Sequence, residues 1–128
     1  MTVKKLTPNL YTDDVESCVK FWVERMKFEK TVGVPDEGKL VFAALQAGNI
    51  ELMYGSWESL EQDAAVSGSV RKGTSFLFIE VDDLDAALNA MNGIPLVSPV
   101  HETFYGATEF SVKDPAGHLI TFAHFAGQ

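Results

Sequence analysis

The order of apolar and polar positions along the chain predicts a succession of short strands and a few amphipathic helices. In 5–12 apolar and polar residues alternate, as they do in a strand with one buried face. In 14–27 the apolar residues recur at helical spacing instead, along a stripe that includes Cys18 and Trp22. Similar patterns predict strands at 28–34, 39–46, 49–54, 75–81, 96–104, 108–113 and 118–125, and helices at 56–65 and 83–92.

The predicted elements repeat once along the chain. LYTDDVESCV at 10–19 matches IEVDDLDAAL at 79–88, and IELM at 50–53 matches ITFA at 120–123, each pair about 70 residues apart. In each copy a strand ends at an Asp-Asp pair, whose first residue, Asp13 or Asp82, we expect to cap the following helix. A period of this length predicts a duplicated βαβββ module, with module one at about 1–65, a linker at about 66–74 and module two at about 75–128.

Alternation also assigns the side chains of each strand to two faces. The aliphatic face should pack beneath the helices, whereas the other face mixes polar and aromatic groups, which suits a small organic ligand better than a dry core. The second face comprises Thr7, Asn9, Tyr11, Glu51, Met53, Phe76, Phe78, Glu80, Thr121 and Ala123. Trp57 and Tyr105 are expected beside it as ligand-stacking walls, with rings packed at a dimer seam as the alternative.

Composition and charge restrict the class of protein. A chain of 128 residues suits one compact domain, and its net charge of −8 disfavours nucleic acid and anionic membranes as partners. No apolar run is long enough to span a bilayer, and the first residues do not resemble a signal peptide. Cys18 is the single cysteine, so no internal disulfide is possible, and we expect it in the core. These features predict a cytoplasmic protein.

Three segments resemble the vicinal oxygen chelate superfamily, which includes glyoxalase I, extradiol dioxygenases and bleomycin-binding proteins. They are LTPNLYTDDVESCVKFWVERMKFEKT, GNIELMYG and FYGATEFSVKDPAGHLITF, which are similar to the family's opening strand and helix, fourth strand and closing strands. The resemblance covers nearly the whole chain. It implies an α+β fold in which two tandem βαβββ modules form a curved mixed sheet around a cleft, and it implies a homodimer.

The resemblance also identifies where a metal site would lie. The family's metal enzymes hold one divalent ion with residues from the first and fourth strands of each module, positions that fall here on Thr7, Glu51, Phe76 and Thr121. Only Glu51 is a conventional ligand, so we expect no metal and no other cofactor. A rearranged divalent-metal site that uses Glu51 and His101 is the alternative, because parity places His118 and His124 away from the cleft, as solvated or edge side chains.

Two functions therefore stay open, and whether the chain is an enzyme is undecided. The first is metal-independent binding of a small organic molecule, similar to bleomycin-resistance proteins that sequester a drug. The net charge of −8 suits cationic ligands. The second is a glyoxalase-like lyase or isomerase in which Glu51 is a general base or part of the rearranged metal site. A carboxylate among Met and Phe side chains would have a raised pKa; alternatively, Glu51 hydrogen-bonds to Thr7 or Asn9 and orders the pocket.

Overall fold

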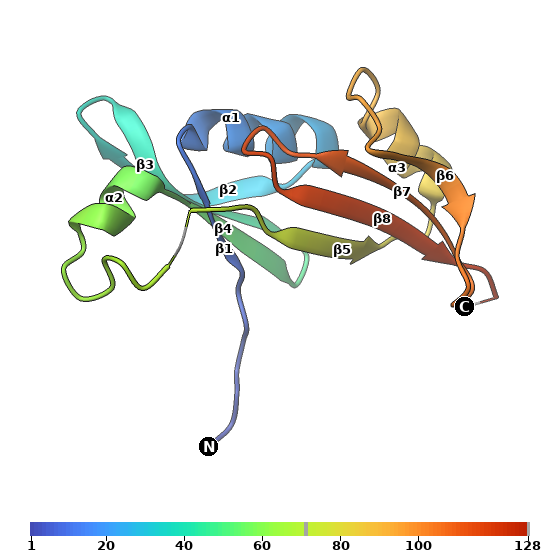
Figure 1. The fold of residues 1–128 in the computed structure, drawn as a ribbon, viewed down its shortest axis with the longest axis horizontal. Coiled ribbons are helices and arrows are strands. Elements are labelled where there is room, and N and C mark those ends of the chain that lie inside the picture. The colour runs from blue at the N-terminus through green and yellow to red at the C-terminus, as the bar shows by residue number, and fades with distance from the viewer. Residues whose placement is uncertain (71, 128) are drawn as a thin grey trace. The chain divides into compact units, whose positions relative to one another are not determined.

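The computed structural model describes residues 1–70 and 72–127, which divide into two compact units, Met1–Gly73 and Thr74–Gln128 (Figure 1). The first unit contains β1 (Asn9–Thr12), α1 (Val15–Lys20), the π-helical segment η1 (Phe21–Arg25), β2 (Glu29–Asp36), β3 (Lys39–Ala47), β4 (Ile50–Ser56) and α2 (Trp57–Gln62). The second contains β5 (Phe76–Glu80), α3 (Leu84–Ala90), β6 (Ser98–Glu102), β7 (Ala107–Lys113) and β8 (Leu119–Phe125).

The two units have the same sheet topology. The first sheet has the strand order β1-β4-β3-β2 and the second has the order β5-β8-β7-β6. In each sheet the first strand runs parallel to the fourth, and the other pairs are antiparallel. The structure therefore confirms the predicted α+β fold of two βαβββ modules.

Both helix caps lie one residue later than the sequence predicts. The carboxylate of Asp14, not Asp13, accepts a hydrogen bond from the backbone N–H of Ser17 at 3.2 Å. The carboxylate of Asp83, not Asp82, accepts one from Ala86 at 3.0 Å. The N-cap is the residue with extended backbone that directly precedes the first helical residue. Either residue of an Asp-Asp pair can take this position. The sequence alone could not choose between them.

Several other boundaries also differ from the prediction, and the largest differences are at β1 and the first helix. Strand β1 begins at Asn9 rather than at residue 5, because Pro8 has no backbone N–H to donate to a ladder, although its carbonyl still accepts from Met53 at 2.9 Å. The first helix is α-helical only to Lys20 and continues as the π-helical η1.

Each unit buries its own set of apolar side chains. In the first, Cys18 and Trp22 are buried as predicted, and the Trp22 indole N–H donates to the Tyr54 hydroxyl at 2.7 Å. In the second, the rings of Phe110 and Phe122 stack with centroids 5.1 Å apart. None of the described helices has the length and apolar character that crossing a bilayer requires.

Candidate functional site

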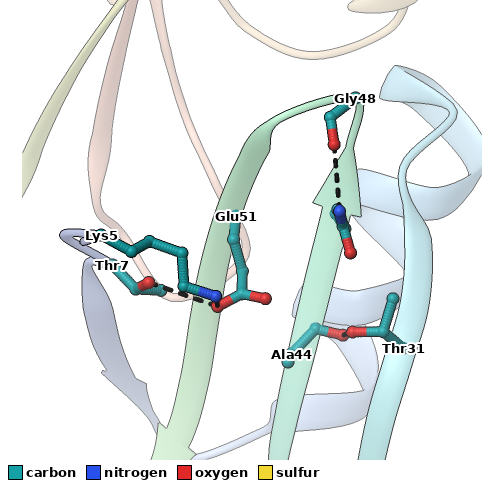
Figure 2. Close-up of polar contacts among 7 residues, drawn as sticks. Lys5, Thr7, Thr31, Ala44, Gly48 and Glu51 are labelled. Carbon is teal, nitrogen blue, oxygen red and sulfur yellow. Dashed lines mark hydrogen bonds and ion pairs between the residues drawn. The ribbon is translucent and has the colours of Figure 1, made fainter.

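A small polar cluster lies on the first unit, where the segment before β1 passes the start of β4 (Figure 2). The hydroxyl of Thr7 donates to Oε1 of Glu51 at 3.2 Å, and Nζ of Lys5 lies 3.0 Å from the same oxygen. The Glu51 side chain is 15% exposed, so these contacts hold a largely buried carboxylate. This arrangement matches the interpretation in which Glu51 bonds to Thr7, and Lys5 is a partner that the sequence analysis missed.

An aromatic corner lies on the same face, at the far end of β1. The register pairs Asn9 with Met53 and Tyr11 with Gly55, so these residues share one face of the sheet. The Tyr11 ring packs on the Trp57 ring with centroids 5.1 Å apart, and the Asn9 amide donates to the Tyr11 hydroxyl at 3.4 Å. A Cβ at Gly55 would lie 2.9 Å from a Tyr11 ring carbon, so the ring lies directly over this glycine.

On the second unit, the register places the other predicted residues on one face as well. Phe76, Phe78 and Glu80 pair with Leu119, Thr121 and Ala123, and the first three are exposed. Thr121 and Ala123 differ from the expectation of a lining role, because both are buried. Thr121 is 3% exposed and its hydroxyl is 2.7 Å from that of Ser111, so a polar pair satisfies it inside the structure.

A continuous row of aromatic rings crosses this second face. Centroid distances are 6.5 Å from Phe78 to Phe125, 6.1 Å from Phe125 to Tyr105 and 5.1 Å from Tyr105 to Phe104. We call Phe78, Phe125, Tyr105 and Phe104 the ring row. It joins β5, the end of β8 and the turn between β6 and β7, three segments that are distant in sequence.

A buried acid that the sequence analysis missed contacts Tyr105 of the ring row. Glu109 in β7 is 6% exposed, and the Tyr105 hydroxyl donates a hydrogen bond to its Oε2. This hydrogen bond, with smaller contributions from burial and from the negative charge of Glu109, raises the pKa of Tyr105. The sequence did contain a signal for this residue: Glu109 shares one face of β7 with the small residues Ala107 and Ser111.

The three histidines have different surroundings. His118 was expected as a solvated or edge residue, but it is 2% exposed and its Nδ1 accepts from the backbone N–H of Ser75 at 2.8 Å. His124 is half-buried with Nδ1 3.1 Å from the Val81 carbonyl oxygen. His101 is exposed and pairs in register with Glu109, which places it on the face of the ring row. His101 belongs to the second unit, whereas Glu51 belongs to the first.

A shallow cavity lies on each unit. The first, of about 530 Å³, is lined by Glu16, Val19, Lys20, Val23, Glu24, Phe28, Glu29, Lys30 and Leu40. The second, of about 350 Å³, is lined by Glu80, Val81, Asp82, His124 and Phe125. Phe125 is therefore both a wall of the second cavity and a member of the ring row.

The residues at the four expected metal positions do not form a conventional donor set. Glu51 supplies a carboxylate that already has a cation partner in Lys5. Thr121 is paired with Ser111, and Phe76 has no donor atom. Among the described residues, no three His, Cys, Asp or Glu side chains are grouped as metal ligands. These residues do not fit the divalent ion of the metal enzymes that the chain resembles.

Comparisons with known proteins cover almost the whole chain. The family model described as Glyoxalase/Bleomycin resistance protein/Dioxygenase superfamily matches residues 4–122. The structure is similar to TioX from Micromonospora sp. ML1, with 21% sequence identity and a TM-score of 0.77 over 95% of this chain and 98% of that one. It is also similar to lactoylglutathione lyase from Agrobacterium tumefaciens, with 18% identity and a TM-score of 0.76 over 96% of this chain and 94% of that one.

A third similar structure is a glyoxalase/bleomycin resistance protein/dioxygenase from Nocardioides, with 16% identity and a TM-score of 0.73 over 99% of this chain and 89% of that one. A comparison with curated proteins found no match. At these identities the solved structures support the fold alone, whereas the family model supports membership.

Proposed function

We propose that this chain, which belongs to the Glyoxalase/Bleomycin resistance protein/Dioxygenase superfamily, binds a small organic molecule without a metal ion and holds it chemically unchanged. Membership of the superfamily follows from the match over residues 4–122. The chemistry of the two sheet faces supports sequestration of a compound such as bleomycin.

The observation that carries the proposal is the contact between Lys5 and Glu51. In the metal enzymes of the superfamily, a carboxylate at this place on the fourth strand binds the ion. Here an ammonium group lies 3.0 Å from that carboxylate, and Thr7 donates to the same oxygen. The positive charge that a metal would supply therefore comes from a side chain, and the other expected positions hold Phe76 and Thr121, which favours binding over metal chemistry.

The Tyr11–Trp57 pair supplies the contact surface that such a function needs. Both rings are only half-buried, so a planar compound would cover the apolar surface that they leave exposed. Stacking of this kind contributes about 0.5–1.5 kcal/mol for each ring pair beyond the burial of area. Asn9 and Glu51 lie on the same face and would orient a polar substituent.

The test combines metal analysis with a titration. Protein purified without a histidine tag should contain well below one divalent ion per chain, and bleomycin should bind equally with and without EDTA. Binding should quench the fluorescence of Trp57. The Trp57→Phe variant should lose this response, because the remaining tryptophan, Trp22, is buried. One tightly held ion per chain, or binding that EDTA abolishes, would contradict the proposal.

A second candidate is a lyase or isomerase that uses Glu51 as a general base. The contacts of the carboxylate with Thr7 and Lys5 both fall on Oε1, which leaves Oε2 to accept a proton from a substrate. Lys5, the cation of this pair, is itself largely exposed. Glu51→Gln keeps the shape and removes the base. Turnover that survives this substitution would rule out the base role, whereas binding without any turnover in the wild type supports sequestration.

We also propose that the protein is a homodimer, as the resemblance implies. The exposed apolar side chains Val32 and Val34 on the edge strand β2 are one observation in favour, because such edges pair readily with another chain. Light scattering that gives the mass of a single 14.0 kDa chain would contradict it.

A further inference from the structure

We infer that Glu109 and the ring row form a subsite for an aromatic organic cation, with the positive group of the ligand at the Glu109 carboxylate and its ring against Tyr105, Phe125 and Phe78. This inference rests on the proposed binding function and names the class of ligand. It concerns one unit alone, and none of its residues occupies an expected metal position.

Glu109 is 6% exposed, and a carboxylate removed from water needs hydrogen-bond or ionic partners. Its partner is a neutral phenol, the hydroxyl of Tyr105. Within the described part of the chain, the ion pairs of lysine involve Glu51, Glu24 and Glu61 but not Glu109. A cationic ligand would therefore supply a stronger partner than the one present.

Tyr105 lies in the turn between β6 and β7 and is 45% exposed, whereas the acid that it contacts is buried. Segments at the surface are more mobile than the elements that they connect, so a small shift of this turn would separate the hydroxyl from Glu109 while the ring stays in the ring row. The hydroxyl of Tyr105 is thus an exchangeable partner, and a ligand cation would replace its hydrogen bond rather than open the core.

Phe78, Phe125 and Tyr105 are neighbouring rings in the part of the second unit that contains Glu109. The faces of aromatic rings attract cations and stack on planar groups. Phe125 also lines the cavity of about 350 Å³, whose wall includes Glu80 and Asp82. Phe125 therefore joins the ring row to a cavity whose lining includes two carboxylates, whereas the cavity on the first unit is lined by lysines as well as acids.

The experiment compares N-methylquinolinium with quinoline, which has nearly the same shape but is neutral at neutral pH. Calorimetric titration of the wild type should show about ten-fold tighter binding of the cation, equivalent to about 1.4 kcal/mol. Glu109→Gln should bring the two affinities to within about two-fold of each other. The matched control is Glu102→Gln, which removes the same charge from an exposed position on the opposite face of β6 and should keep the preference.

Tyr105→Phe separates the subsite from a purely structural role of Glu109. It retains the ring but removes the competing hydroxyl, so the cation should bind several-fold more tightly while the free protein becomes less stable. Because Tyr105 is at the surface, this variant tests the inference even if Glu109→Gln does not fold.

Three outcomes would overturn the subsite. Equal affinity for both compounds in the wild type and in Glu109→Gln would show binding without recognition of charge, and the proposed function would stand. Weaker cation binding in Tyr105→Phe would show that the hydroxyl belongs to the ligand site instead. No binding of either compound would also reject the subsite, and the bleomycin titration would then decide separately whether the proposed function fails with it.

Discussion

Nζ of Lys5 lies 3.0 Å from Oε1 of Glu51, so an ammonium group neutralises the one carboxylate at an expected metal position. Lys5 is 61% exposed and comes from the segment before β1, whereas Glu51 is on β4 and mostly buried. The pair therefore joins a largely buried acid to a cation at the surface.

Lys5→Ala should lower the free energy of unfolding by no more than about 1 kcal/mol, because the cation is at the surface and screened by solvent. The difference from the wild type, measured by urea denaturation, should shrink as the salt concentration rises. Lys4→Ala is the matched control, since Lys4 is an exposed neighbour of the same charge. A loss of several kcal/mol that does not depend on salt would show that Lys5 has a packing role.

Asp14→Ala should destabilise the protein by about 1 kcal/mol, whereas Asp13→Ala should have little effect, because only Asp14 caps α1. The hydrogen bonds from the Ser17 hydroxyl and backbone N–H lower the pKa of Asp14 below its usual 3.8. A lowered folded-state pKa contributes stability above the unfolded pKa, and this contribution is lost as pH falls through the folded pKa. The two variants should therefore differ at neutral pH and converge in strong acid, and equal effects at neutral pH would contradict the assignment of the cap.

Gly55→Ala should destabilise the protein by about 1–3 kcal/mol, as overpacking usually does. The new Cβ would lie 2.9 Å from a ring carbon of Tyr11, so the ring must move and its contact with Trp57 must change. The fluorescence of Trp57 should report this movement in the native state. Gly73→Ala is the control, because a Cβ there meets nothing within 4 Å. An unchanged spectrum in Gly55→Ala would show that Tyr11 does not rest on this glycine.

Tyr105 should be the tyrosine whose titration responds to Glu109. The hydrogen bond to Glu109 raises the pKa of Tyr105, so its stabilising contribution is present below its unfolded pKa, near 10.0, and is lost as pH rises through the folded value. The difference in tyrosinate absorbance between the wild type and Tyr105→Phe isolates this group. In the Glu109→Gln background the same difference should appear at lower pH, and an unchanged midpoint would contradict the contact.

Local patterns were sufficient for the architecture. The matching Asp-Asp segments and the period-two alternation of 5–12 predicted two βαβββ modules, because strand and helix periodicities depend on neighbours in the chain. Cys18 and Trp22 were correctly assigned to the core for the same reason. The parity argument also placed Phe76 and Phe78 on one face with Thr121, as the register shows.

Tertiary structure decided which of these side chains are open to a ligand and which are already paired. Parity could not show that Thr121 is buried against Ser111, or that His118 accepts a hydrogen bond from Ser75, because each contact joins two different segments of the chain. Nor could it bring Tyr105 to Glu109 or Lys5 to Glu51. The sequence by itself determined the two modules and their faces, through short-range periodicity. The pairing of each polar group was set only by strand register and by the turns that return the chain, since a hydrogen bond requires atoms within about 3 Å of each other.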